Sequence, residues 1–173
     1  MTPSGRLRAM TNRISATLAA VRIVRPALEK FYNSLSDEQQ ARFNALGPNI
    51  GERSQRQPQQ EANAEPDTCG EPKSSLTHLP IERIEAVIRP VGTQKEALGR
   101  LGGSTEKAVQ GLQAACPDNV PLTPTGRLEA MEKRLEAMLQ AAKLVQPALD
   151  EFYATLSSEQ KARFNTLQQV ASP

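Results

Sequence analysis

The chain has 173 residues, of which only 3% are aromatic and none is tryptophan, so we do not expect a large β core. The formal net charge of +2 is too close to balance for the concentrated basic surface of nucleic-acid-binding proteins, so we expect no nucleic-acid partner. The longest apolar runs are shorter than the roughly 18 residues that a spanning helix needs, so we expect no membrane insertion.

Residues 5–35 carry apolar side chains at heptad spacing, which predicts a long amphipathic helix with an apolar seam. Pro26 lies inside this run, where proline removes a backbone hydrogen bond and bends or breaks a helix. The seam continues in phase beyond the proline, so we expect one kinked helix. Its seam positions are Leu7, Met10, Ile14, Val21, Val24, Leu28, Phe31 and Leu35.

A short helix is predicted directly after the long one. Ser36 is followed three residues later by Gln39, which is the spacing of a capping box. In this arrangement the serine hydroxyl accepts from the backbone inside the helix, and the glutamine side chain bonds back to the cap residue. Phe43 then belongs to the buried stripe of the short helix.

Residues 48–79 are rich in proline, glutamine and glutamate, which predicts a flexible linker. Beyond it, residues 80–90 form a short amphipathic helix with Ile84 and Ile88 on one face. Residues 93–116 form the next helix, for which we expect a capping box that begins at Thr93. We expect these two helices to pair with each other in an antiparallel hairpin.

The only cysteines are Cys69 and Cys116, without a spacing or a histidine partner that is typical of a metal site. A disulfide between them is sterically possible and would imply an oxidising compartment. Two free, buried thiols are the alternative.

Residues 2–46 return as residues 123–167, with roughly 26 of 45 positions identical, which indicates a structural unit used twice. The second copy therefore predicts another long helix, kinked at Pro147, and another capping box at Ser157 and Gln160. Residues 80–170 would form a complete four-helix unit. Residues 1–47 would form a partial one, with only the long helix and the short helix.

The partial unit has consequences for the whole chain. We expect the chain to begin inside a longer unit. Its first residues therefore do not tell whether an export signal precedes them. An amphipathic helix pair rarely buries enough surface alone, so its seam must be covered by the second unit or by another chain. We therefore expect a homodimer.

The sequences LSDEQ at residues 35–39 and LSSEQ at residues 156–160 both fit L-[TS]-x-x-Q. Together with PALxxFYxxLSxEQxARFN around them and LPIERIEAVIRP upstream of the second copy, they resemble the LTXXQ-motif family, which includes the Spy and CpxP relatives of the Gram-negative envelope. These blocks resemble its extended, rhizobial-type members. The matching motif residues are Leu35, Ser36, Gln39, Leu156, Ser157 and Gln160.

This resemblance implies an all-α protein with antiparallel helical hairpins that form a cradle or bundle. It also implies a periplasmic, ATP-independent chaperone of the envelope stress response, which binds unfolded or stress-damaged polypeptides. An envelope structural or regulatory module that binds a partner, without general chaperone activity, is the alternative. A metal sensor ranks third, because the seam spacing of Met10, Met131 and Met138 favours core packing over metal binding.

The first long helix is rich in arginine and the second in glutamate, and two interpretations are open. The charges either lie on solvated faces or pair between the copies, or they form a basic, partly apolar surface for unfolded chains. The aromatic residues near the helix ends are likewise either core or client-binding. The candidate client-binding residues are Arg6, Arg13, Arg22, Phe31, Tyr32, Phe152 and Tyr153.

We expect no enzymatic activity, no cofactor and no metal site. His78 is the sole histidine, lies in the predicted linker and has no nucleophile at a recognisable spacing.

Overall fold

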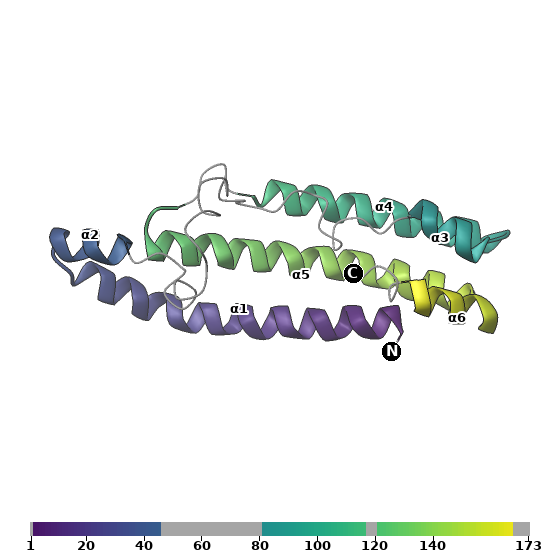
Figure 1. The fold of residues 1–173 in the computed structure, drawn as a ribbon, viewed down its shortest axis with the longest axis horizontal. Coiled ribbons are helices and arrows are strands. Elements are labelled where there is room, and N and C mark those ends of the chain that lie inside the picture. The colour runs from purple at the N-terminus through teal and green to yellow at the C-terminus, as the bar shows by residue number, and fades with distance from the viewer. Residues whose placement is uncertain (1, 46–80, 117–120, 168–173) are drawn as a thin grey trace, which may run out of the picture.

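The computed structural model describes residues 2–45, 81–116 and 121–167. Within these ranges it consists of helices without a strand, so the prediction of an all-α fold is confirmed (Figure 1). The predicted linker and Cys69 lie outside the described residues, and the disulfide stays a prediction. The helices are α1 (Pro3–Asn33), α2 (Asp37–Ala45), α3 (Ile81–Ile88), α4 (Thr93–Ala114), α5 (Pro124–Thr155) and α6 (Ser158–Leu167).

The two long helices, α1 and α5, begin in the same way. The Thr2 hydroxyl accepts from the backbone N–H of Gly5, and the Thr123 hydroxyl accepts from that of Gly126, each at 3.1 Å. A proline follows each threonine at the first helical position, where its missing N–H costs nothing. Both helices then continue through their internal prolines, as predicted, and the last third of α1 bends away from its first part in Figure 1.

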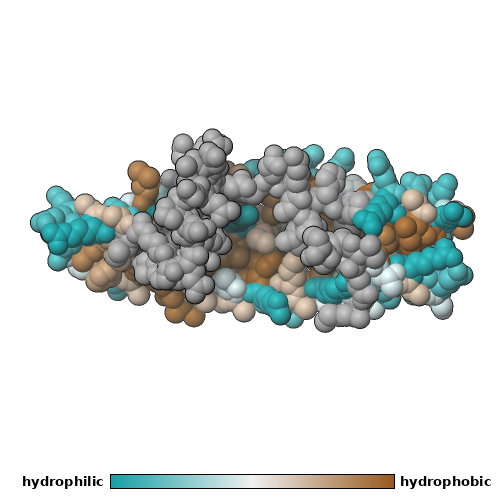
Figure 2. Space-filling model, viewed as in Figure 1, coloured by the Kyte–Doolittle hydropathy of each residue, from teal (hydrophilic) through white to brown (hydrophobic). Residues whose placement is uncertain are grey.

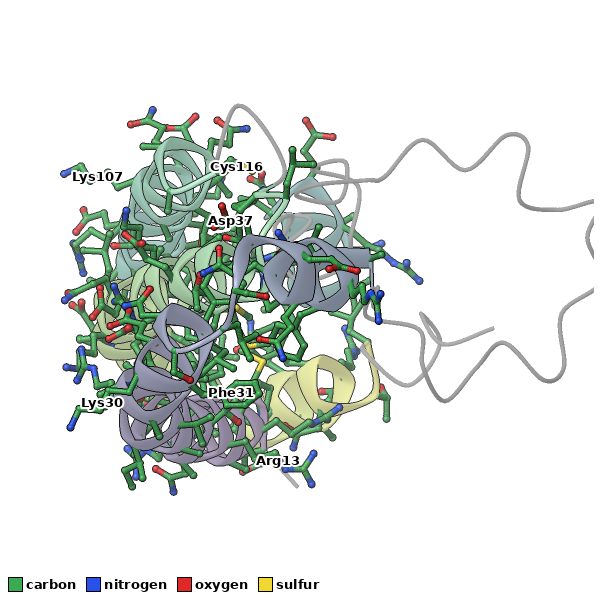
Figure 3. The ribbon with its side chains drawn as sticks, turned by 90° about the vertical axis from the view of Figure 1, so that its left-hand side faces the viewer. Arg13, Lys30, Phe31, Asp37, Lys107 and Cys116 are labelled. Atoms are coloured by element: carbon green, nitrogen blue, oxygen red, sulfur yellow. The ribbon has the colours of Figure 1, made fainter. Side chains whose placement is uncertain are left out.

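The helices α1, α5 and α4 lie side by side, with α5 in the middle and antiparallel to both neighbours (Figure 1). Viewed along the long axis, the three form one layer, and α2 and α6 lie on one side of it (Figure 3). The helix α3 has its most extensive contact with α6, while α4 packs on α5. The helices α3 and α4 also contact each other, but the contact of each with the second copy is more extensive.

The core is concentrated where α3 and α4 meet the end of α5 and α6. Its largest fully buried side chains are Phe152, Phe164, Ile88 and Leu101. By contrast, α1 buries only positions that face α5, together with Pro3 at its start. The buried seam residues are Ile14 and Val21, and Leu18, which is not one of the predicted seam positions, is buried beside them.

The seam of α1 is covered over only part of its length, which corrects the expectation of a continuous buried seam. Val24 is 53% exposed and Phe31 is 51% exposed. For Phe31 the reason is the antiparallel offset of α1 and α5. Arg25 of α1 already pairs with Glu129 in the second turn of α5, so Phe31, six residues later, extends past the start of α5. The offset does not explain the exposure of Val24, which precedes Arg25.

Two local expectations were wrong. Thr93 does not cap α4; the cap residue is Gly92, at a positive φ of 52°, which glycine adopts without strain. No side chain caps the first turn; instead Gln94 of that turn reaches back, and its Oε1 accepts from the backbone N–H of Val91 at 3.2 Å. Met131, expected in the core, is 47% exposed.

Candidate functional site

The two sequence motifs fold into the predicted capping boxes. The backbone N–H of Ser36 donates to Gln39 Oε1 at 2.9 Å, and the N–H of Gln39 donates to Ser36 Oγ at 3.4 Å. In the second copy, Ser157 and Gln160 make the same two bonds at 2.9 and 3.2 Å. The motif thus starts α2 and α6 by the reciprocal bonds that a capping box provides.

Each motif belongs to a compact helix end that contains the same aromatic residues. We name the end of α1 with α2 the first tip, and the end of α5 with α6 the second tip. The first tip contains Phe31, Tyr32, Leu35, Gln39 and Phe43, and the second contains Phe152, Tyr153, Leu156, Gln160 and Phe164.

The rings are arranged alike in the two tips. Phe31 and Phe43 meet edge to face with centroids 5.7 Å apart, and Phe152 and Phe164 repeat this at 5.7 Å. The hydroxyl of Tyr32 also bonds the side-chain oxygen of Asn44 at 3.1 Å. Tyr153 and Asn165 make the same contact in the second tip at 3.3 Å. The two sequence copies therefore build the same local structure.

Gln160 has a further role that the sequence reasoning missed. Its Nε2 donates to the backbone oxygen of Ile88, at the end of α3, and to Gln94 Oε1, each at 3.1 Å. Gln94 in turn donates to the backbone oxygen of Thr155 at 2.8 Å, so the two amides connect α3, α4, α5 and α6. No sequence signal marks these contacts, because the partners of Gln160 lie 66 and 72 positions away.

Only one of the four aromatic client-binding candidates is well exposed. Phe31 is half exposed, whereas Phe152 has no exposed surface and forms part of the core. Tyr32 and Tyr153 are half-buried, with their hydroxyl groups bonded within their own tips. In this structure Phe152 is not available to a client.

An apolar groove lies between α1 and α4, with α5 as its floor. It has a volume of about 230 Å³ and is open to one face of the molecule. That face shows hydrophobic side chains near its middle (Figure 2). Of the lining residues, only Arg6 is charged; the others are Pro3, Leu7, Met10, Ile14, Thr105, Ala108, Val109, Leu112, Met138, Ala141, Ala142, Val145, Leu149 and Phe164.

The three arginine candidates have different environments. Arg6 lines the groove and donates to the backbone oxygen of Asn165 at 3.0 Å. Arg13 is exposed and lies on the side of α1 toward α6 in Figure 3, and no ion pair holds it within the part of the chain described above. Arg22 is bound to α5 by Glu132, at 3.1 Å, and by Glu136. Arg22 is thus a contact between the copies and not a free basic surface.

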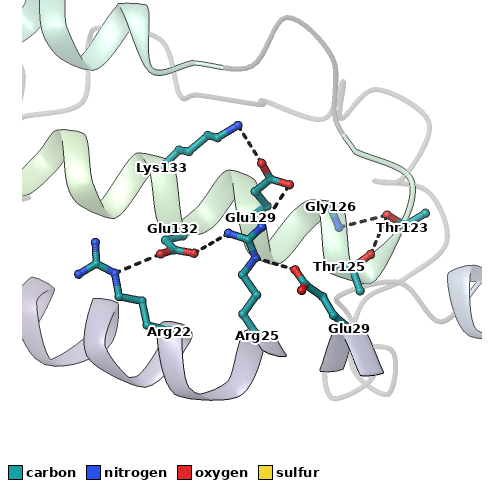
Figure 4. Close-up of polar contacts among 9 residues, drawn as sticks. All are labelled: Arg22, Arg25, Glu29, Thr123, Thr125, Gly126, Glu129, Glu132 and Lys133. Carbon is teal, nitrogen blue, oxygen red and sulfur yellow. Dashed lines mark hydrogen bonds and ion pairs between the residues drawn. The ribbon is translucent and has the colours of Figure 1, made fainter. Parts of the chain in front are cut away.

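Arginines of α1 and glutamates of α5 form a network where the two helices meet (Figure 4). Glu132 accepts from Arg25 at 2.9 Å and from Arg22 at 3.1 Å, and Arg25 also binds Glu29 at 2.8 Å. The hydrogen bonds from Arg25, and next those from Arg22, hold the pKa of Glu132 below its ordinary value. At these positions the arginines of the first copy therefore pair with the glutamates of the second, so the two copies carry complementary charges.

Metal binding and membrane insertion have no support among residues 2–45, 81–116 and 121–167. These ranges contain no group of three histidine, cysteine, aspartate or glutamate side chains placed to hold a metal ion. Met10 and Met138 face the apolar groove. None of the described helices is long and apolar enough to cross a membrane.

Comparison with known proteins gives one finding. A family model described as LTXXQ motif family protein matches residues 1–47 and 76–168, which include both copies of the repeat. No curated protein and no solved structure matches the chain. Because the match covers most of the sequence and both capping-box tips, the chain belongs to the LTXXQ motif family.

Proposed function

We propose that this protein is an ATP-independent, periplasmic chaperone that binds unfolded or stress-damaged polypeptides in the groove between α1 and α4. The observation that carries the proposal is the groove itself, an open and mostly apolar surface built from α1, α4 and α5 with Phe164 of α6. Unfolded chains expose apolar side chains, and an amphipathic helix or extended segment can place several of them in such a groove.

The size and charge of the groove fit transient binding. A volume of about 230 Å³ accommodates a few side chains, so each contact is weak and release is fast. Arg6 at the groove and the exposed Arg13 add positive charge on the α1 side. Such charge speeds the encounter with acidic segments without adding much affinity, and salt screens it.

The remaining parts of the proposal have their support in the family. A periplasmic location and a homodimer are expected from the resemblance to Spy and CpxP relatives, and a binding role needs no catalytic residue or cofactor. Sedimentation of the purified protein over a concentration series tests the dimer. Fractionation of cells that express the gene from its own promoter tests the location.

The holding activity is tested with a model client that aggregates on reduction or heating, at stoichiometric ratios. Met10→Gln combined with Leu112→Gln makes both walls of the groove polar and should raise the concentration needed for half-maximal suppression about fivefold or more, because each loses apolar contact with the client. The matched control is Ile23→Gln, which changes an α1 residue that is 75% exposed outside the groove.

Full suppression by the groove variant, with circular dichroism unchanged, would contradict the groove as the holding site. Absence of suppression by the native protein across a salt series would reject the chaperone proposal. It would favour the alternative, an envelope module that binds a defined partner.

A further inference from the structure

The second tip shows which kind of segment its side chains bind. Ile84 and Ile88, four residues apart on α3, are buried in the same core cluster as Phe152 and Phe164, and α3 packs mainly against α6. The amide of Gln160 closes this contact by donating to the last carbonyl of α3, at Ile88. The cover of the second tip is therefore a short helix with two aliphatic side chains, followed by the start of α4.

The first tip has the same groups in the same geometry, and no helix among the described residues covers it as α3 and α4 cover the second. Phe31 is 51% exposed where Phe152 has no exposed surface, and Val24 is 53% exposed where its counterpart Val145 is 9% exposed. Gln39 makes the two capping-box bonds and, within the described ranges, no bond to another helix. The apolar face and the amide donor are thus preformed and unused.

One charge differs between the tips at the position that contacts the cover. In the second tip, Glu151 binds Arg100 of α4 at 2.7 Å. The repeat places Lys30 at the position of Glu151, and the Lys30 side chain points to the same side of the layer as Lys107 of α4 in Figure 3. The α4 helix of a second copy would bring Arg100 against Lys30, which is a repulsive pair. A partner with an acidic residue there would be attracted.

We propose that the first tip is a docking site for a pair of consecutive helices of another protein, with two aliphatic side chains four residues apart on the first helix and an acidic residue opposite Lys30 on the second. The aliphatic pair covers Phe31 and Phe43, the counterparts of Phe152 and Phe164, and the amide of Gln39 binds the carbonyl at the end of the partner's first helix. This site is separate from the groove, because neither Phe31 nor Lys30 lines it. Its failure would leave the chaperone proposal intact.

The test uses the full chain and two synthetic peptides of residues 81–107, one native and one with Arg100→Glu. We expect the Arg100→Glu peptide to bind about threefold more tightly, since it replaces a repulsive exposed pair with an attractive one. The Lys30→Glu variant of the protein should reverse this order. Phe31→Ser should weaken both peptides about tenfold, as expected for an aromatic anchor, while Ile23→Ser, a matched exposed apolar position of α1, should not.

A fusion guards against peptides that fail to fold alone. Residues 81–122 with Arg100→Glu are placed before Thr2, so that they precede α1 as they now precede α5. We expect slower hydrogen exchange in residues 24–45, and Phe31→Ser should remove the gain. Peptide binding and exchange protection that do not change on substitution of Phe31 and Lys30 would overturn the proposal. Absence of both binding and protection would also overturn it. Dimerisation of the unmodified protein that Phe31→Ser abolishes would also overturn it, because the occupant would then be a second copy.

Discussion

The first and second tips have nearly the same sequence and the same internal geometry, yet they differ in their contribution to the fold. Both have the capping box and the edge-to-face ring pair. Only the second is covered by α3 and α4, and only there are both rings of the pair fully buried. The motif thus builds the local structure of a helix end, and that end is buried in the core only where α3 and α4 pack against it.

The largest expected difference between the tips concerns their phenylalanines. Phe152→Ala removes a fully buried ring and should lower the free energy of unfolding by about 3–5 kcal/mol. Phe31→Ala removes a half-exposed ring and should cost about 1 kcal/mol or less. Urea unfolding followed by circular dichroism measures both, and equal losses would show that the first tip is also covered in solution.

The motif glutamines distinguish the two tips, because both complete a capping box but only Gln160 also binds α3 and α4. Gln160→Ala removes the cap, the donor to the part-buried Ile88 carbonyl and one of the two donors to Gln94 Oε1, so we expect a loss of about 1–3 kcal/mol. Gln39→Ala removes only the cap and should cost about 0.5 kcal/mol. The same unfolding assay tests the pair; a larger loss for Gln39→Ala would contradict the assigned roles.

The motif serines should behave alike at the local level. Each caps its helix, so alanine should cost about 1 kcal/mol of helix stability at either position. Because α6 is packed into the core and α2 is not, Ser157→Ala should lower global stability, whereas Ser36→Ala should only increase hydrogen exchange within α2. A global loss from Ser36→Ala would indicate that α2 belongs to the cooperative core.

The smallest effect concerns the ion pairs that join α1 to α5 between the tips. Hydrogen bonds from Arg25 and Arg22 lower the pKa of Glu132 from its ordinary value of 4.5. A carboxyl group with a lowered folded-state pKa stabilises the fold above its unfolded pKa, and this contribution is lost as the pH falls through the folded pKa. Glu132→Gln should therefore reduce stability at neutral pH and flatten its decline below about pH 4.5, in unfolding curves measured at low salt. If the pH dependence of the free energy of unfolding does not change, Glu132 does not contribute to acid destabilisation.

Much of the local structure could be predicted from the sequence, because it depends on neighbouring residues. The long helices, their continuity through Pro26 and Pro147, and both capping boxes follow from periodicity and from pairs three residues apart. The cap of α4 was missed because Gly92 supplies a backbone conformation, and Gln94 supplies the hydrogen bond from a position that is not typical of a cap side chain.

The long-range contacts could not be predicted, since the sequence does not state how the helices are offset. A heptad seam marks which residues of α1 are apolar but not how far α5 extends along them, so Phe31 was expected to be buried. The client-binding candidate Arg22 was assigned without knowing that Glu132 and Glu136 lie opposite it. The sequence leaves open whether charges of the two copies pair with each other. The antiparallel register of α1 and α5 shows that they do so at Arg22.

Hydrogen exchange of the native protein tests the central claim most directly, namely that two like tips differ in their cover. We expect amides in the last turns of α5 and in α6 to exchange at least about tenfold more slowly than their counterparts in α1 and α2, because only the former are covered by α3 and α4. Equally slow exchange in both tips would contradict the account.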